Sequence, residues 1–366
     1  MKRKIFILLL FMFLLPYTRA DAEQYILKSG ESISGTYAGE EDFDYCQIST
    51  SKGGFLAITA KTSDKKPLLL DICDENKEIT AANIKIPNGK TVFHRAENNK
   101  IYYLRVKGKE GETYKLSYKV KSKDFMTLKY AKKYNYIFTN ASLSGEKNAL
   151  MLKIKASKSG ILHFMCETDN TLIAQYCDSS KKKISGKTVM SKHSLSGIGV
   201  KSQKEYYIKL WNNEDTNSGT CTLKDMKYQI KLLSVSRNDS RGRSVLLDNG
   251  RNKKKEALVV AGEKNTFWYK IRLYSTKKLS LSIESRLLQN NGSYLLVDLY
   301  NSKGKKITNN SIVINDKASA NYKGKKYIMN YPKKKIVTGD LPANDYYVRV
   351  VSKTKTTSGS FCITLN

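Results

Sequence analysis

The sequence lacks the short motifs that mark many hydrolases and structural metal sites. Its 366 residues contain no HExxH signature, no Gly-x-Ser-x-Gly element and no CxxC pair. Only three histidines occur, at positions 94, 163 and 193, and they are scattered along the chain. Nucleophilic catalysis needs a base and an orienting partner within hydrogen-bond reach of the nucleophile. We therefore predict that the protein is not an enzyme.

Long apolar runs are also scarce. The longest run, residues 5–15, is shorter than the roughly 20 residues that span a bilayer. It follows three basic residues and precedes Pro16 and the small-residue pattern Ala20-Asp21-Ala22, which is the arrangement of a secretory signal peptide. We predict a signal peptide at residues 1–22, with an uncleaved anchor as the alternative. The mature chain should be extracellular, without a membrane span.

Acidic residues are half as frequent as basic ones. The chain has 65 Lys and Arg against 33 Asp and Glu, a formal charge of +32, and losing residues 1–22 would leave +29. Such a surface attracts polyanions. Outside a cell these include teichoic-acid-like wall polymers, anionic lipid, acidic glycans and free nucleic acid. Because no nucleic-acid motif occurs, we expect an anionic cell-wall or extracellular polymer as the partner, and no specific nucleic acid.

One eleven-residue segment occurs three times, at residues 38–48, 144–154 and 261–271 (AGEEDFDYCQI, SGEKNALMLKI and AGEKNTFWYKI). Each copy is followed in the same order by an apolar alternating strand, by a strand with a polar turn, and by a Tyr-Tyr strand. A last strand then begins at Tyr114, Tyr228 and Phe361. Such a fixed order indicates a tandem repeat.

Each repeat shows short strands with period-2 alternation, separated by Gly, Asn, Asp and Lys turns, and no amphipathic helix. About 100 residues of this kind predict a β-sandwich. The expected fold is all-β: three tandem antiparallel sandwiches of the jelly-roll type after the signal peptide. The predicted boundaries are 23–122 for the first domain, 123–236 for the second, 237–255 for a basic linker, and 256–366 for the third domain, with an insertion at 308–340. Only five prolines and no Ser/Gly-rich linker occur, so the domains should abut closely.

The segment GESISGTYAGEEDFDYCQI, together with the Tyr-Tyr-x-Arg-Val strand, resembles the bacterial pre-peptidase C-terminal (PPC) domain family. Asp42, Asp44 and Tyr45 match its Asp-x-Asp-Tyr element in repeat 1 only, whereas the closing Tyr-Tyr strand matches in all three repeats. The resemblance covers nearly all of the mature chain. It implies a small bacterial β-sandwich that binds a substrate polymer, including collagen in some relatives, and is not catalytic. The family's usual peptidase domain does not accompany the repeats.

Four aromatic residues are the candidate ligand contacts. In the Tyr-Tyr pair of each repeat one ring should point inward and one outward, which makes Tyr103, Tyr207 and Tyr347 the outward rings. Trp211 follows a predicted strand and is the candidate for an exposed platform. Most of the 24 tyrosines are expected to serve core packing.

Six cysteines in an exported chain suggest disulfides. The favoured pairs are Cys166–Cys177 and Cys177–Cys221. Strand phase argues against a simple scheme, because Cys166 lies on the inward phase and Cys177 on the outward one. Bridged Cα atoms must also approach within about 7 Å.

No cofactor is expected, and a calcium site in repeat 1 is the alternative, because calcium takes six to eight oxygen ligands. The candidate carboxylates there are Glu40, Glu41, Asp42, Asp44, Asp71, Asp74 and Glu75. Repeats 2 and 3 place lysine where repeat 1 has Glu41, so the three repeats cannot share such a site.

The sequence therefore predicts a secreted, non-catalytic binding or adhesion protein, extracellular and associated with the cell wall. Its ligand would be an anionic or fibrous polymer, namely a cell-wall polymer, a glycan or a matrix protein, bound weakly by each domain and more strongly by several together. The alternative is an accessory or scaffold partner of a separate secreted peptidase or other hydrolase. A hydrolase that uses the repeat 3 insertion is a further alternative.

Overall fold

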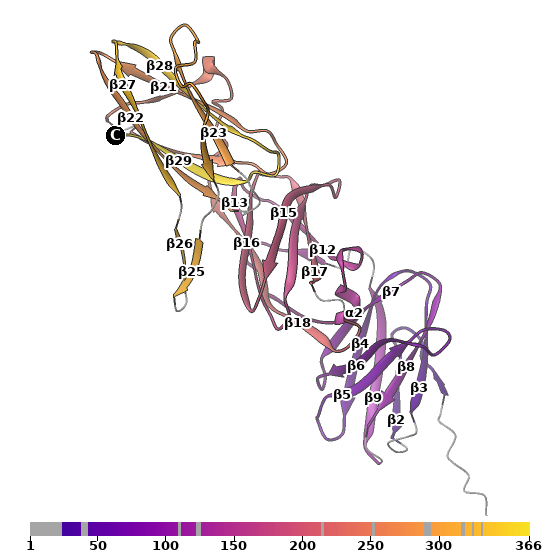
Figure 1. The fold of residues 1–366 in the computed structure, drawn as a ribbon. Coiled ribbons are helices and arrows are strands. Elements are labelled where there is room, and N and C mark those ends of the chain that lie inside the picture. The colour runs from indigo at the N-terminus through magenta and orange to yellow at the C-terminus, as the bar shows by residue number, and fades with distance from the viewer. Residues whose placement is uncertain are drawn as a thin grey trace, which may run out of the picture. The chain divides into compact units, whose positions relative to one another are not determined.

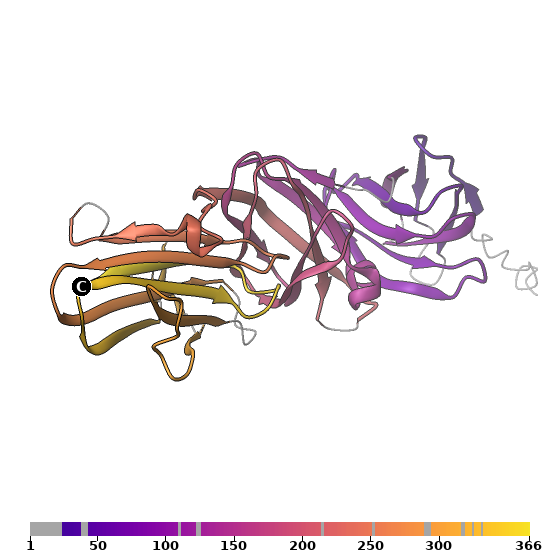
Figure 2. The same cartoon turned by 90° about the horizontal axis from the view of Figure 1, so that it is seen from above.

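The computed structural model describes residues 24–37, 43–108, 111–121, 126–213, 216–250, 253–288, 294–315, 319–323, 326–330 and 332–366. The predicted signal peptide lies outside these residues. The chain forms two compact units, residues 1–123 with 217–220, and residues 124–216 with 221–366. Almost all of the described elements are strands (Figures 1 and 2), which confirms the predicted all-β class. In the described part of the chain, no helix has the length and apolarity needed to cross a membrane.

The first unit contains one sandwich, which we call sandwich 1. Its five-stranded sheet has the order β1 (Gln24–Ile26), β3 (Asp44–Thr50), β8 (Lys100–Lys107), β5 (Leu68–Cys73) and β6 (Ile79–Ile86). Its other strands run β7 (Thr91–Ala96), β4 (Gly54–Thr62), β9 (Thr113–Lys121) and β2 (Ser32–Thr36). Strand β1 pairs in parallel with β3, and the pairings of β3 with β8, β8 with β5, β5 with β6, β4 with β7 and β9, and β9 with β2 are antiparallel.

The second unit contains sandwiches 2 and 3. In sandwich 2 the five-stranded sheet is β10 (Met126–Leu128), β12 (Leu150–Lys155), β17 (Glu205–Asn212), β14 (Leu172–Cys177) and β15 (Lys183–Met190). Opposite it lie β16 (His193–Val200), β13 (Gly160–Thr168), β18 (Thr220–Leu232) and β11 (Tyr134–Thr139). A short helix α2 (Asn140–Leu143) and a 3-10 turn η1 (Glu146–Asn148) precede β12.

Sandwich 3 repeats the same order. Its five-stranded sheet is β19 (Val245–Leu247), β21 (Thr266–Leu273), β28 (Asn344–Ser352), β23 (Tyr294–Asn301) and β24 (Ile312–Asn315). Its second sheet is β20 (Lys254–Val259), β29 (Gly359–Leu365), β22 (Lys277–Leu287) and β27 (Lys333–Leu341), and a 3-10 turn η2 (Arg241–Arg243) precedes β19. The three repeats of the sequence are therefore three copies of one sandwich.

The turn after the third strand of each repeat shows the equivalence in detail. Its αL position is held by Lys77, Lys181 and Gly304, with φ of 62°, 61° and 83°. Three residues earlier an Asx side chain caps the turn by accepting a backbone N–H: Asp74, Asp178 and Asn301. The same backbone conformation is thus reached with different residues.

The core of each sandwich lies between its two sheets. The strand that follows the eleven-residue motif buries every second residue, as its period-2 pattern predicted: Leu56, Ile58 and Ala60; Leu162, Phe164 and Cys166; Leu279, Leu281 and Ile283. Burial of one such large aliphatic side chain contributes about 1.5–3 kcal/mol. The alternation fixes the register, since a slip by one residue would expose this whole set.

The predicted basic linker, residues 237–255, differs from the structure. Strand β19 lies inside it and pairs in parallel with β21, and Leu247 is buried in the core of sandwich 3. Asn238 is also buried, and its side-chain amide donates to the Trp268 carbonyl. The basic composition of this stretch concealed a three-residue strand that only its neighbour in the sheet stabilises.

The predicted insertion, residues 308–340, is narrower in the structure. Strand β24 takes the place of β6 and β15, and β27 takes the place of β7 and β16. What is additional is the hairpin of β25 (Ser319–Lys323) and β26 (Lys326–Asn330), which pair only with each other. Low similarity to the other repeats had made two ordinary strands look like part of the insertion.

The last strand of repeat 2 is also shifted relative to the sequence alignment. Tyr228 lies opposite Phe164, as Tyr118 lies opposite Ile58, so Tyr228 corresponds to Tyr118 and not to Tyr114. Both hydroxyls donate to a backbone carbonyl at the end of the motif strand, Tyr118 at 3.1 Å and Tyr228 at 3.2 Å. The β-bulge after Met165 is the irregularity that accompanies this shift.

Within the second unit, sandwiches 2 and 3 are packed together. Gly199 of β16 receives a hydrogen bond on its carbonyl from Ala261 N–H (3.0 Å) and donates its own N–H to Ser358 Oγ (2.6 Å). An apolar cluster joins the two sandwiches beside them, formed by Ile161, Leu258 and Val260 with Leu233 and Leu288. These contacts make a joint between the two sandwiches.

Candidate binding faces

The outer face of each five-stranded sheet, the side away from the core, carries two rows of side chains that recur in all three sandwiches. The first, the charged row, crosses three paired strands: Tyr45, Arg105 and Asp71; Met151, Lys209 and Gln175; Trp268, Arg349 and Asp298. The second, the tyrosine row, lies two residues away: Gln47, Tyr103 and Cys73; Lys153, Tyr207 and Cys177; Lys270, Tyr347 and Tyr300. Pairing across the sheet brings these residues together from distant parts of each repeat.

In sandwich 1 the buried carboxylate of Asp71, a member of the charged row, is contacted by two cationic side chains. Lys107 Nζ lies 2.6 Å from its Oδ2, and Arg105 donates to the same oxygen through Nε (3.0 Å) and Nη2. The backbone N–H of Asn83 donates to Oδ1 at 2.8 Å. Burial alone would raise the pKa of Asp71, but these hydrogen bonds outweigh it and hold the pKa below its usual range. One ionised carboxylate thus holds two cations in place.

Sandwich 3 repeats the arrangement around Asp298. Arg349 Nη2 and Lys306 Nζ lie 2.7 and 2.8 Å from its two oxygens, and Ser311 Oγ donates at 2.7 Å. Here too burial would raise the pKa of Asp298, and the donors hold it below its usual range. The carboxylate is again outnumbered by the cations that contact it.

In sandwich 2 a carboxylate also contacts several cations, but this carboxylate belongs to a different element. Gln175 occupies the position of Asp71, and the carboxylate comes from Glu146 of η1. Lys183, Lys187 and Lys209 contact it at 2.7, 3.3 and 3.5 Å. The hydrogen bond from Lys183 is the main cause that lowers the pKa of Glu146 to about 2. Three cations share one carboxylate, so this face has the largest local excess of positive charge among the three rows.

The three tyrosines that the sequence predicted to point outward lie on this outer face, each with a cation above its ring. Lys77 Nζ is 5.3 Å from the ring centroid of Tyr103, and Lys181 Nζ is 5.6 Å from that of Tyr207. Tyr103 is half-buried, whereas Tyr207 is only 8% exposed, so its ring presents little surface to a ligand. The paired inward tyrosines are buried, and their hydroxyls bond the backbone of the preceding turn: Tyr102, Tyr206 and Tyr346.

In sandwich 3 the cation over Tyr347 is Arg241, whose guanidinium carbon lies 4.4 Å from the ring centroid. A Cβ on Gly304 would lie 2.7 Å from Arg241 Nη1. Repeats 1 and 2 place a lysine at the position of Gly304, so arginine from the preceding segment replaces that lysine. The glycine leaves the room that Arg241 needs.

The outer face of sandwich 3 also carries two aromatic residues that the sequence did not single out, Trp268 of the charged row and Tyr300 of the tyrosine row. The Trp268 and Tyr300 rings lie 5.3 Å apart between centroids, and the Arg349 guanidinium is 5.8 and 5.4 Å from them. Both rings are half-buried. The signal for this cluster was the arginine two positions after the outward tyrosine in repeats 1 and 3, which faces an aspartate on the neighbouring strand.

The prediction for Trp211 was wrong. The residue belongs to β17 and is 4% exposed, packed with Ala149 and Ile173. Ser144 forms a β-bridge with the next residue, Asn212, which brings the segment between β11 and β12 against this end of the strand. A segment distant in sequence therefore covers the ring that local sequence had placed in solvent.

The predicted disulfides do not form, and all six cysteines are free and buried. Cys166 and Cys221 lie in the sheet of β13 and β18, facing the core. Cys177 lies in the other sheet, on its outer face beside Tyr207. A bridge from Cys177 to either of the other two would have to pass through a sheet. Burial raises the pKa of Cys221 to about 12, which keeps that thiol protonated and unreactive.

Three of the carboxylates considered for calcium in repeat 1 are engaged by different groups of the protein. Asp44 accepts from the buried Tyr114 hydroxyl (2.7 Å), Asp71 contacts Arg105 and Lys107, and Asp74 caps its own turn. Glu40, Glu41 and Asp42 lie outside the described residues. Within the described ranges, no group of three His, Cys, Asp or Glu side chains is placed to hold a metal ion.

No protein-family model and no curated protein matches the chain. Among solved structures, the pre-peptidase C-terminal domain of a collagenase from Bacillus anthracis aligns with 26% of this chain and 95% of its own, at 20% identity and a TM-score of 0.22. The tandem CBM22 domains of Xyn10C from Paenibacillus barcinonensis align with 61% of this chain and 84% of theirs, at 10% identity and a TM-score of 0.19. A triple jelly-roll protein of an archaeal virus covers 93% of this chain and 89% of its own, at 8% identity and a TM-score of 0.24. Scores this low assign neither ligand nor activity, and the PPC likeness stays a resemblance.

Proposed function

We propose that the protein is a secreted, non-catalytic binding protein that attaches to an anionic extracellular polymer through the outer faces of its five-stranded sheets. The observation that supports this is the charged row: in each sandwich one carboxylate is contacted by two or three cations. The carboxylate orients the cations, and the remaining positive charge is available to a ligand.

Orientation before binding favours affinity, because long Lys and Arg side chains otherwise lose rotamer freedom when a ligand orders them. The half-buried rings of Tyr103, Tyr347 and Trp268 add flat contact area beside the charges. Three faces on one chain then act together on a polymer, since the second and third contacts are intramolecular. The formal charge of +32 steers the polymer toward the protein.

The test is sedimentation of the chain from residue 23 with isolated bacterial cell walls, at low and high salt. Exposed charge contacts are screened beyond a Debye length of about 8 Å at physiological ionic strength. We expect the protein to sediment with walls at low salt and to be released at high salt. Walls stripped of their anionic polymers should not retain it, and retention on stripped walls would contradict an anionic ligand.

Matched lysine variants distinguish the faces from net charge. Replacing Lys181, Lys183 and Lys187 by Gln removes three exposed charges on the outer face of sandwich 2. The control replaces by Gln three exposed lysines of the same sandwich that lie in turns or on the other sheet, namely Lys132, Lys158 and Lys231. The outer-face variant should lose most of the wall binding and the control little. Equal losses would show that wall binding depends on total charge and not on the outer face of the sandwich.

A further inference from the structure

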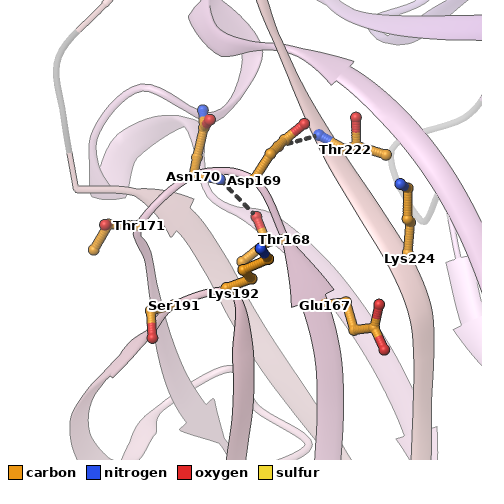
Figure 3. A pocket seen from close by; sticks show the side chains of 9 residues that line it. All are labelled: Glu167, Thr168, Asp169, Asn170, Thr171, Ser191, Lys192, Thr222 and Lys224. Carbon is orange, nitrogen blue, oxygen red and sulfur yellow. Dashed lines mark hydrogen bonds between the residues drawn. The ribbon is translucent and has the colours of Figure 1, made fainter.

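A cavity of about 380 Å³ lies in sandwich 2, outside the outer face (Figure 3). It is lined by the end of β13, by the turn between β13 and β14, by the turn between β15 and β16, and by β18. The lining residues are Glu167, Thr168, Asp169, Asn170, Thr171, Ser191, Lys192, Thr222 and Lys224. All nine have polar side chains, whose carbon atoms also form much of the wall.

Several of the polar groups are held in place by the protein. Asp169 Oδ1 accepts the Thr222 N–H at 2.7 Å, and the Asn170 N–H donates to Thr168 Oγ1 at 3.2 Å; both bonds are drawn in Figure 3. The Asn170 side-chain amide donates to Asn140 Oδ1 at 2.7 Å, and Asn140 itself is buried in α2. These anchors fix donors and acceptors before a ligand arrives, which lowers the entropy lost on binding.

The polar lining is not a general consequence of the fold. The corresponding loop of sandwich 1 borders a cavity of about 530 Å³ whose lining includes Phe43, Pro67 and Leu69. Both cavities lie where the strand after the eleven-residue motif ends, at Thr62 and at Thr168. Repeat 2 therefore uses polar residue types throughout this corner, whereas repeat 1 also places aromatic and aliphatic residues there.

The charges of the cavity balance. Glu167 and Asp169 are matched by Lys192 and Lys224, so the site has no excess charge that would select a polyanion. Carboxylate, amide, hydroxyl and ammonium groups that converge on one cavity are complementary to a ligand with many hydroxyl groups.

We propose that this cavity binds a neutral saccharide, independently of the charged row. Sugar hydroxyls would donate to Asp169 and accept from the Asn170 amide and from Lys192. The proposal concerns a different surface and a different ligand class from the polyanion-binding faces. Either can fail without the other.

Titration calorimetry tests it with the chain from residue 23 and a panel of neutral sugars: glucose, galactose, mannose, N-acetylglucosamine and their β-linked disaccharides. We expect at least one of them to bind with the same affinity at low and high salt. The Asp169→Ala variant should weaken that binding about 10-fold or more, since a hydrogen bond to a charged group contributes about 1.5–3 kcal/mol. Asp248→Ala is the matched control, because Asp248 also accepts a backbone N–H, from Gly250, but lies in sandwich 3.

A second variant guards against an effect on folding, because Asp169 also anchors a loop. Lys192 is exposed and lies on the cavity, so Lys192→Ala should weaken sugar binding while the thermal unfolding of the protein stays unchanged. The proposal is overturned if no sugar of the panel binds. It is also overturned if binding disappears at high salt, or if both cavity variants bind as well as the Asp248→Ala control.

Discussion

The joint between sandwiches 2 and 3 depends on a residue without a side chain, and Gly199→Ala should open it. An added Cβ would lie 2.1 Å from the Val259 carbonyl oxygen, so the two backbones must separate by about 1 Å to reach ordinary van der Waals contact. That movement disrupts the hydrogen bond from Gly199 N–H to Ser358 Oγ and the one from Ala261 N–H to the Gly199 carbonyl. Each is worth about 0.5–1.5 kcal/mol, and both groups are buried, so we expect a loss of about 2–4 kcal/mol of coupling between the sandwiches.

The two tryptophans allow the sandwiches to be followed separately, because Trp211 lies in sandwich 2 and Trp268 in sandwich 3. Urea unfolding is measured by fluorescence in Trp211→Phe and Trp268→Phe backgrounds, each with and without Gly199→Ala. With an m-value of about 1–3 kcal/mol/M, the midpoint of the less stable sandwich should fall by about 1–2 M. The gap between the two midpoints should widen accordingly.

The control is Gly339→Ala, since no atom lies within 4 Å of the Cβ that it would add. Gly339 is exposed on β27, away from the contacts of the joint. If Gly199→Ala moves the midpoints no more than Gly339→Ala does, the two sandwiches are not coupled through Gly199. The reasoning from the close approach would then be refuted.

Three further predictions concern single groups. Burial, with Arg95 nearby, lowers the pKa of His94 to about 4, below its ordinary 6.5. As the pH falls, the unfolded chain therefore binds the proton before the folded one does. The contribution of His94 to stability is complete above pH 6.5, and the free energy of unfolding should fall by about 3 kcal/mol between pH 6.5 and 4. Urea midpoints across that range check this, and His94→Leu should remove most of the dependence; an unchanged slope in the variant would assign the effect to other groups. A thiol reagent should titrate no cysteine in the native protein and all six after unfolding in guanidinium, because the six are free and buried; fewer than six would reveal a disulfide. Gly304→Lys should destabilise sandwich 3 by about 1–2 kcal/mol, because Arg241 occupies the space that the new side chain needs. Most of that loss should vanish in an Arg241→Ala background. Additive losses in the double-mutant cycle would contradict the idea that Arg241 replaces the lysine of repeats 1 and 2.

The sequence was informative where structure repeats a local pattern. Period-2 alternation placed Leu56, Ile58 and Ala60 in the core, and the Tyr-Tyr pairs predicted which ring of each pair would lie on the outer face. These predictions succeeded because a strand sends successive side chains to opposite faces whatever its neighbours are. The repeat of a whole pattern at three places then predicted three sandwiches.

The same alternating pattern predicted the solvent exposure of individual side chains less reliably. Asp71 and Cys177 are on the outer face, as their strand phase predicted, yet both are fully buried. Arg105 and Lys107 of the neighbouring strand contact Asp71, and Cys177 lies between Tyr207 and Lys183 of the two strands beside it, which phase along one strand cannot show. Trp211 was misjudged for a similar reason, because the segment that covers it comes from a different part of repeat 2.

The sequence by itself determined that this protein has three β-sandwich repeats, a strong positive charge and an outward tyrosine in each repeat, because composition and alternation are properties of short stretches of chain. Only the tertiary structure decided which cations share a carboxylate. Asp71 contacts Arg105 across 34 positions of sequence, whereas in repeat 2 Glu146 contacts Lys209 from the turn at the start of the motif. Pairing between strands sets these neighbours, and the register of a sheet depends on contacts between segments far apart in the chain.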